Sequence, residues 1–211
     1  ICSAAHGGAG GDDAARFARS LFGRIADKDL GLAPPEQRAG AALALLAFAR
    51  RRLPGVAKVR VLNPSEADHG FDSRHTIAQI VNDDMPFLVD SIANEFNRRE
   101  IAVHLLAHPV VAVHRDIDGD LVGFAADSGP AGRFESLMHI EIDRQNDPAL
   151  LDELAAALTR VLCLLAPRLD ACGAQELQHF SQALRGRFVP PGPSGSPSRG
   201  ARPTEMPPRW A

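Results

Sequence analysis

The spacing of hydrophobic residues changes along this 211-residue chain and divides it into segments of different structure. Over residues 13–55 apolar side chains recur every three or four positions, the spacing of helices with one buried face. The first predicted helix runs from a cap at Asp12 or Asp13 to about Ala26. The second covers residues 36–52, after a pair of prolines. Residues 13–55 are therefore expected to be a helical lead-in.

Beyond residue 55 apolar residues alternate with polar ones, as in strands. Two segments in which apolar residues recur every three or four positions, as in helices, interrupt this alternation. Strands are predicted over residues 58–62, 76–81, 101–115 with a bend near Pro109, 121–125 and 138–142. Helices are predicted over residues 86–100 and from 148 to a stop at Pro167. Asp118-Gly119 is expected to be a hairpin turn, and residues 65–74 and 128–133 are expected to be loops.

The order of these elements predicts an α+β fold. From Thr76 the chain runs strand, helix, strand, strand, strand, helix, which indicates a βαββαβ-type sandwich with both helices on one face of an antiparallel sheet. No closing strand is visible after the second helix, and residues 58–62 could fill that edge instead. We therefore predict an α+β domain over residues 56–166 and a further helical segment over residues 167–187.

Both ends of the chain have compositions typical of disorder. Residues 1–12 are small and Gly-rich, and residues 188–211 consist largely of Pro, Gly, Ser and Arg. Such segments cannot bury enough apolar surface to offset the loss of chain entropy on ordering. Both are expected to be disordered.

Charge and cysteine content narrow the classes of function. The net charge of −3 argues against a nucleic-acid partner, because such proteins usually carry a basic patch. No apolar run approaches the ~20 residues that span a bilayer, so no membrane partner is expected. The three cysteines show no C-x-x-C spacing, and the N-terminus lacks the basic and apolar regions of a signal peptide. We expect a reduced, cytoplasmic protein.

Eight histidines raise the question of a metal or catalytic site. His104, His108 and His114 share strand parity, but three or four ligands must converge about 2 Å from a metal ion, and strand neighbours are spread out. Solvent-facing strand positions explain them better, and His139 is likewise expected on the wet face of its strand. With no phosphate-binding loop and no triad order in the sequence, a small hydrolase using the histidines is the weakest alternative. We expect no metal and no catalytic residue.

One junction has a functional interpretation beyond stability. Residues Asn82, Asp83, Asp84, Met85 and Pro86 lead a buried strand into a helix, whose free N–H groups and dipole could bind a carboxylate. Alternatively the aspartates only cap the helix, with the proline in its first turn. From the residues alone, capping is the favoured interpretation.

Several blocks around this junction resemble one known family. Residues 81–104 read V-N-D-D-M-P-F-L-V-D-S-I-A-N-E-F-N-R-R-E-I-A-V-H and closely resemble the N-terminal region of large bacterial NAD-specific glutamate dehydrogenases. K-V-R-V-L-N-P at 58–64, H-P-V-V-A-V-H-R-D at 108–116 and E-S-L-M-H-I-E-I-D-R-Q at 135–145 resemble the same region. With the helices from about Asp29, the resemblance covers roughly residues 29–165.

The resemblance implies a fold and a biological setting. It implies an ACT-like domain, hence an ACT/ferredoxin-like sandwich, in a homo-oligomeric family that converts L-glutamate to 2-oxoglutarate and ammonia with NAD. The family's catalytic and nucleotide-binding domains lie much further along a long chain. This sequence is therefore expected to be a fragment that binds no cofactor and is inactive alone. Its expected partners are its own downstream catalytic domains or other subunits, and its expected role is assembly or regulation.

Two features depart from the family pattern. ACT domains often bind amino acids at a D-x-P-G-like junction; Asp84 and Pro86 match it, but Phe87 replaces the glycine that gives a ligand access to the backbone. An amino-acid effector at Asn82–Pro86 is thus less favoured than a structural role, and a free-standing amino-acid-binding module is the alternative. The resemblance also fades after about Leu165, where a reading-frame shift or a truncated gene is a further hypothesis.

Overall fold

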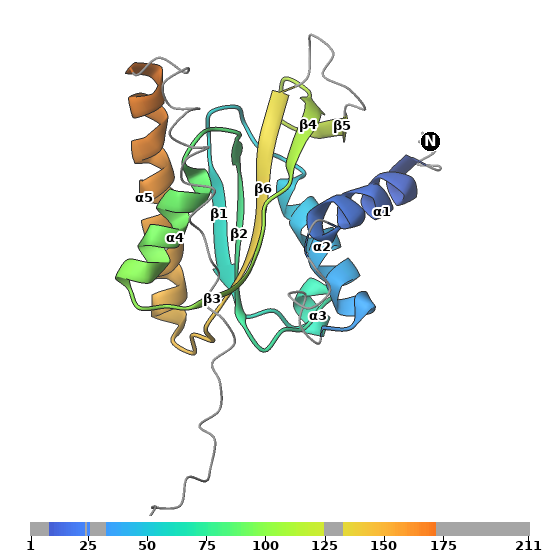
Figure 1. Ribbon diagram of the computed structural model, residues 1–211. Helices are drawn as coiled ribbons and strands as arrows, with labels where there is room; N and C mark the ends of the chain where they lie inside the picture. The colour runs from blue at the N-terminus through green and yellow to red at the C-terminus, as the bar shows by residue number, and fades with distance from the viewer. Residues whose placement is uncertain (1–8, 24, 26–32, 125–132, 172–211) are drawn as a thin grey trace, which may run out of the picture.

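The computed structural model describes residues 9–23, 25, 33–124 and 133–171 and arranges them in three layers. A mixed set of helices covers both faces of one antiparallel sheet (Figure 1). The helices are α1 (Ala9–Phe22), α2 (Pro35–Ala49), α3 (Glu66–His69), α4 (Leu88–Arg98) and α5 (Pro148–Ala171). The strands are β1 (Lys58–Leu62), β2 (Thr76–Asp83), β3 (Val103–Ala107), β4 (Val110–Arg115), β5 (Leu121–Phe124) and β6 (Arg133–Ile142).

The sheet is built around the long central strand β6. Its order is β1-β2-β6-β4-β5, with β3 also paired to β6. Strands β3 and β4 lie end to end along β6: Ala107 pairs with His139 and Val110 with Ser136. The predicted bend near Pro109 is thus the break between β3 and β4. Strand β1 pairs antiparallel with β2 at the edge of the sheet, the edge that residues 58–62 were expected to be able to fill.

Helices α4 and α5 lie together on one face of the sheet (Figure 1), which confirms the α+β sandwich. Helical spacing along α4 brings Leu88, Ile92 and Phe96 to this face, all almost fully buried. They pack with Leu154 and Leu158 of α5 and with the apolar residues of β6. Each such side chain contributes on the order of 2 kcal/mol when removed from water. The α5 start is as predicted, since Asp147 accepts a hydrogen bond from the Ala149 N–H at 2.9 Å.

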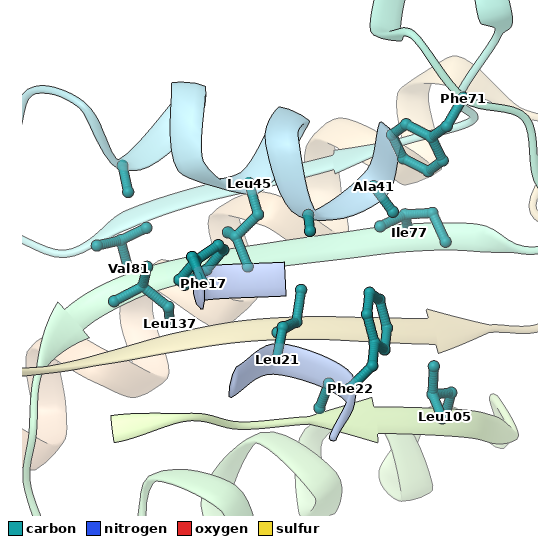
Figure 2. Close-up of a cluster of buried hydrophobic side chains, with 13 residues drawn as sticks. Phe17, Leu21, Phe22, Ala41, Leu45, Phe71, Ile77, Val81, Leu105 and Leu137 are labelled. Carbon is teal, nitrogen blue, oxygen red and sulfur yellow. The ribbon is translucent and has the colours of Figure 1, made fainter. Parts of the chain in front are cut away.

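The helical lead-in covers the opposite face of the sheet. Figure 2 shows Leu45 of α2 above β2, and Leu21 and Phe22 of α1 over β6 and its neighbour. His139 of β6 lies under this layer with only 1% of its surface exposed, and Phe22 meets its ring edge-on. The prediction that His139 faces solvent is therefore wrong, because helices α1 and α2 cover the face of the sheet on which its side chain lies.

Several element boundaries differ from the predictions. Helix α1 begins at Ala9 and ends at Phe22, so Asp12 and Asp13 lie inside it and residues 9–12, expected to be disordered, form its first turns. The 65–74 segment contains the short helix α3, capped by Ser65. The backbone of α5 stays helical past Pro167 as far as Ala171, since a proline removes one helical hydrogen bond but does not always end a helix.

Other expectations lie outside the described residues. These are the tail at 188–211, the helical segment beyond residue 171, the first eight residues and most of the 128–133 loop. Among the helices that the structure describes, none is long and apolar enough to cross a membrane.

Candidate functional site

The strand–helix junction at residues 82–86 is held by contacts within the domain. Asn82 is buried, and its side-chain amide donates to the Asp83 carbonyl oxygen at 3.0 Å. The Asp83 carboxylate accepts hydrogen bonds from the Arg52 guanidinium and from the Gly55 N–H at 2.8 Å. Met85 packs against the α4–α5 core, and Pro86 is half-buried. The junction is therefore tied to the end of the lead-in.

Arg52 is the centre of a buried network of charges. Its side chain is 0% exposed and donates to Glu135 at 2.7 Å as well as to Asp83. Arg115 donates a hydrogen bond to each carboxylate oxygen of Glu135, both at 2.7 Å. Two guanidinium groups thus face two carboxylates, so the buried charges balance.

The arginines keep both carboxyl groups ionised. Burial opposes ionisation of Glu135, but hydrogen bonds from Arg115 and Arg52 outweigh it and hold its pKa below the ordinary value. Burial likewise acts against ionisation of Asp83, and the hydrogen bond and charge of Arg52 more than compensate, so this pKa is also lowered. Neither group is available to exchange a proton at neutral pH.

Asp84 does not cap α4 as predicted. Its carboxylate accepts a hydrogen bond from the Ser136 hydroxyl at 2.6 Å, and His108 Nε2 lies 2.9 Å from the same hydroxyl oxygen. Since the serine proton goes to Asp84, His108 Nε2–H donates to the serine oxygen. A nucleophilic serine instead needs histidine as its base, between the serine and the acid. This chain of contacts has the wrong order for hydrolysis.

Phe87 explains the missing cap. Its backbone has φ 65° and ψ 8°, the left-handed conformation, and α4 begins only at Leu88. The N-cap position of α4 is therefore Phe87 and not Asp84, and no side chain caps the helix there. Phe87 thus adopts the left-handed backbone conformation that a glycine would adopt easily at this position. For a residue with a side chain this conformation costs about 1–2 kcal/mol.

The histidines are dispersed over different environments. His114 is exposed on β4, and His69 Nδ1 accepts a hydrogen bond from the Ser65 N–H. The rings of His75 and His104 are in contact, with centroids 4.2 Å apart and planes tilted by 30°, and His104 Nε2 lies 2.7 Å from Asp143. Over the part of the chain that the structure describes, no group of three or more His, Cys, Asp or Glu could hold a metal ion.

A cleft of about 320 Å³ lies between the lead-in and the sheet. Phe22 and Phe71 form part of its apolar wall, and Glu141 and His139 of β6 line it from the sheet side. His139 is held by Gln79, 3.3 Å from its Nδ1. This cleft could not be predicted from the sequence, because its walls come from segments over a hundred residues apart.

Arg52 and Glu135 were also not predicted. Arg52 stands at the end of a predicted helix, where arginines are usually solvated. One signal could have found Glu135: it shares strand parity with Leu137, a core residue. A carboxylate on a buried face needs a cationic partner, but the sequence does not say which arginine supplies it.

The fold and the junction define a class before any comparison. An antiparallel sheet with two helices packed together on one face is the arrangement of an ACT-like α+β domain. The family model described as glutamate dehydrogenase, ACT1 domain, matches residues 17–158. The chain therefore belongs to the ACT1 domain family of glutamate dehydrogenases.

Two relatives are NAD-specific glutamate dehydrogenases. The chain is 40% identical over 149 residues to the NAD-specific glutamate dehydrogenase of Halomonas elongata, and 34% identical over 149 residues to that of Pseudomonas aeruginosa. Each match covers 69% of this chain but only 9% of the relative. A shorter match, 62% identical over 42 residues, is to the aerobic cobaltochelatase subunit CobN of Pseudomonas aeruginosa and covers 19% of this chain and 3% of that subunit. No solved structure matches the chain significantly.

Proposed function

We propose that this domain is the non-catalytic N-terminal region of an NAD-dependent glutamate dehydrogenase and acts in the assembly or regulation of its catalytic part. In the full-length enzyme, glutamate is converted to 2-oxoglutarate and ammonia with NAD bound elsewhere. The partners of this domain are the downstream catalytic domains or other subunits of a cytoplasmic homo-oligomer. The domain itself binds no NAD.

One observation carries the proposal beyond family membership. The polar side chains of the junction bond arginine and serine partners inside the domain, as Asp83 does with Arg52 and Asp84 with Ser136. A group that already has its partners contributes to rigidity rather than to chemistry. A rigid domain with its acids paired is suited to holding other domains in place.

Two measurements test this role. The purified 211-residue chain, incubated with L-glutamate and NAD, is expected to form no NADH, with the intact Halomonas elongata enzyme as the positive control. Deleting the matching segment from that enzyme should change its subunit assembly or its response to effectors. NADH formation by the chain alone contradicts the proposal, and so does a deletion that leaves both assembly and regulation unchanged.

The alternative is a free-standing amino-acid-binding module with its ligand at Asn82–Pro86. One oxygen of the exposed Asp84 carboxylate accepts a hydrogen bond from Ser136, so the ammonium group of an effector would have to bind beside that contact. Calorimetry with glutamate, aspartate and arginine separates the two. Saturable binding that is lost in Asp84→Ala would favour the module.

A further inference from the structure

The side of α2 that faces away from the sheet is apolar and open to solvent. From residue 39 to residue 49 the helix carries no polar side chain. Ala41 and Leu45 point from it toward the sheet in Figure 2 and are buried. On the opposite side Ala39, Leu43 and Ala47 are exposed, with a relative exposure of 52% at Leu43. A helix that packs on one side only usually carries polar residues on the other, so this side has the composition of a contact surface.

Charged residues stand at the two ends of this apolar stretch. Glu36 lies in the first turn of α2, Arg50 is its C-cap residue, and both are exposed. Glu36, Leu43 and Arg50 follow one another at a spacing close to two turns of ~3.6 residues each, so they lie on one side of the helix. Neither charged side chain forms an ion pair or a hydrogen bond with another described residue. The α2 outer face, made of Glu36, Ala39, Leu43, Ala47 and Arg50, is thus negative at one end, apolar in the middle and positive at the other end.

The pattern of the α2 outer face is symmetric about Leu43. Glu36 precedes Leu43 by seven residues and Arg50 follows it by seven, while Ala39 and Ala47 are each four residues away. Two copies of the helix that lie antiparallel and meet at Leu43 therefore place Glu36 of each copy opposite Arg50 of the other. They also place the alanine at 39 opposite the alanine at 47. Such a two-fold contact uses the same surface on both copies, whereas a parallel pair would bring like charges together.

We propose that α2 forms an antiparallel pair with α2 of a second copy of this chain, about a two-fold axis at Leu43. The exposed alanines on either side of Leu43 allow the two helix axes to approach to about 8–10 Å, the usual distance between packed helices. The charges favour a second copy as the occupant, because each end of the α2 outer face is complementary to its other end. The pairing deepens the proposed function and rests on it for its biological meaning, since it names a surface by which subunits assemble.

Sedimentation velocity on the purified 211-residue chain tests whether the pair forms. One helix pair buries less than the ~800 Å² per partner of a standard interface, so we expect a reversible dimer with a dissociation constant on the order of 10–100 µM. The average mass should rise from that of a monomer to that of a dimer between about 1 µM and about 1 mM, which brackets this constant. A chain that remains monomeric at the highest concentration overturns the proposal.

Leu43→Glu places two carboxylates together at the axis and should weaken dimerisation about tenfold or more. Because more than half of Leu43 is exposed in the single chain, this variant is expected to fold, which circular dichroism checks. Leu164→Glu is the matched control, since Leu164 is an exposed leucine on another helix, α5, at 65%. A dimer that persists unchanged in Leu43→Glu, or that is lost equally in Leu164→Glu, contradicts the proposal.

Exchange of the charges tests the antiparallel register. Glu36→Arg and Arg50→Glu each place like charges opposite one another at both ends of the pair and should weaken dimerisation about tenfold at low salt. The double variant with both substitutions restores opposite charges and should recover the affinity of the wild type. An equimolar mixture of the two single variants should form the mixed dimer in preference to either homodimer. A double variant as weak as the single ones rules out this register.

Cysteine cross-linking tests the position of the axis. With the three native cysteines replaced by serine, Leu43→Cys should form a disulfide between two copies under mild oxidation. Facing positions of packed helices bring Cα atoms within the ~4.4–6.8 Å that a disulfide spans. Ala47→Cys is the control on the same side of the helix: its counterpart lies about 12 Å away along the axis and should not cross-link. Equal cross-linking at both positions would place the axis elsewhere and overturn the proposal.

The outcome is separable from that of the proposed function. Failure of this inference is read from the mass, charge exchange and cross-linking of the 211-residue chain. Failure of the proposed function is read from NADH formation, or from unchanged assembly and regulation when the whole segment is deleted from the intact enzyme. Neither of those readings depends on how α2 pairs.

Discussion

At the scale of single residues, Arg52 links the helical lead-in to the sheet. Its guanidinium bonds Asp83 of β2 and Glu135 of β6, and also donates to the Val56 carbonyl oxygen at 3.1 Å. Its Nε is buried and has no hydrogen-bond partner among the described residues. A fully buried guanidinium is costly to desolvate, and its two carboxylate partners are the main groups that offset that cost.

Replacing Arg52 by Met should therefore lower the free energy of unfolding by about 3–5 kcal/mol, because Asp83 and Glu135 would remain buried with less compensation. Urea unfolding followed by circular dichroism measures the change. Arg160→Met on the exposed side of α5 is the matched control and should change stability by less than about 0.5 kcal/mol. Equal effects of the two substitutions would show that Arg52 is not a structural link.

Glu135 should make the stability of the domain dependent on acid pH. The pKa values of Glu135 and Asp83 are lowered in the folded state from their ordinary 4.5 and 3.8. The unfolded chain therefore takes up protons first, and stability is full above about pH 5 and falls as pH drops through the folded-state values. In Glu135→Gln the fall should be shallower, and in Asp152→Asn on α5 it should be unchanged. Thermal unfolding between about pH 6 and pH 3 measures the slope. Parallel curves for wild type and Glu135→Gln would argue against the network.

Asp84 shows why individual contacts were harder to predict than elements. An Asp two residues before a proline has the sequence pattern of a helix cap. In the structure the Asp84 carboxylate instead accepts a hydrogen bond from Ser136, 52 residues further along the chain. Contacts across such a separation leave no periodic signal. The left-handed backbone at Phe87 is also invisible in its residue type, since bulky residues rarely adopt it.

At the scale of elements, the approach of α2 to α3 depends on one glycine. A Cβ added at Gly40 would meet the Gly70 carbonyl oxygen at 2.2 Å and the Phe71 Cβ at 2.8 Å. Phe71 is buried beneath α2 and forms part of the cleft wall. The absence of a side chain at Gly40 thus sets how close the two helices come.

Gly40→Ala should lower the free energy of unfolding by about 1–3 kcal/mol through overpacking, despite the better helix propensity of alanine. Gly123→Ala in β5 is the control, because nothing lies within 4 Å of its added Cβ. Differential scanning calorimetry of both variants measures the effect. If Gly40→Ala is as stable as wild type, α2 can shift away from α3 without loss.

The elements themselves were largely predictable, because their apolar spacing is regular. The helical spacing of apolar residues along α4 and their alternation with polar residues along β6 correctly predicted which side chains are in the core. The same alternation could not distinguish solvent from a second helical layer, since Gln79 and His139 are polar yet buried under α1 and α2. Polar residues that bond one another inside a core look, in sequence, like residues facing water.

At the scale of the whole molecule, the sheet is buried on both faces. Ile77, Val81 and Leu137 pack under the lead-in, as Figure 2 shows, and the opposite side packs under α4 and α5. The lead-in is thus one half of the core rather than an appendage. Its loss would expose both this apolar face and the Glu135 carboxylate.

A chain that starts at residue 56 should therefore not unfold cooperatively. We expect it to bind a hydrophobic dye, to give poorly dispersed NMR spectra and to lack a sharp thermal transition, as compact states without fixed packing do. The intact chain measured under the same conditions is the reference. A sharp transition close to that of the intact chain would mean that the α+β core is stable without the lead-in.

The place of β6 in the chain has a consequence for synthesis on the ribosome. Strands β1 and β2 pair with each other, and so do β4 and β5, but these two pairs meet only through β6. Because β6 is the last of the described strands to be made, these two strand pairs stay unconnected until about residue 142 has left the exit tunnel. Their apolar surfaces and free edges stay available to chaperones, or to neighbouring nascent chains, up to that moment.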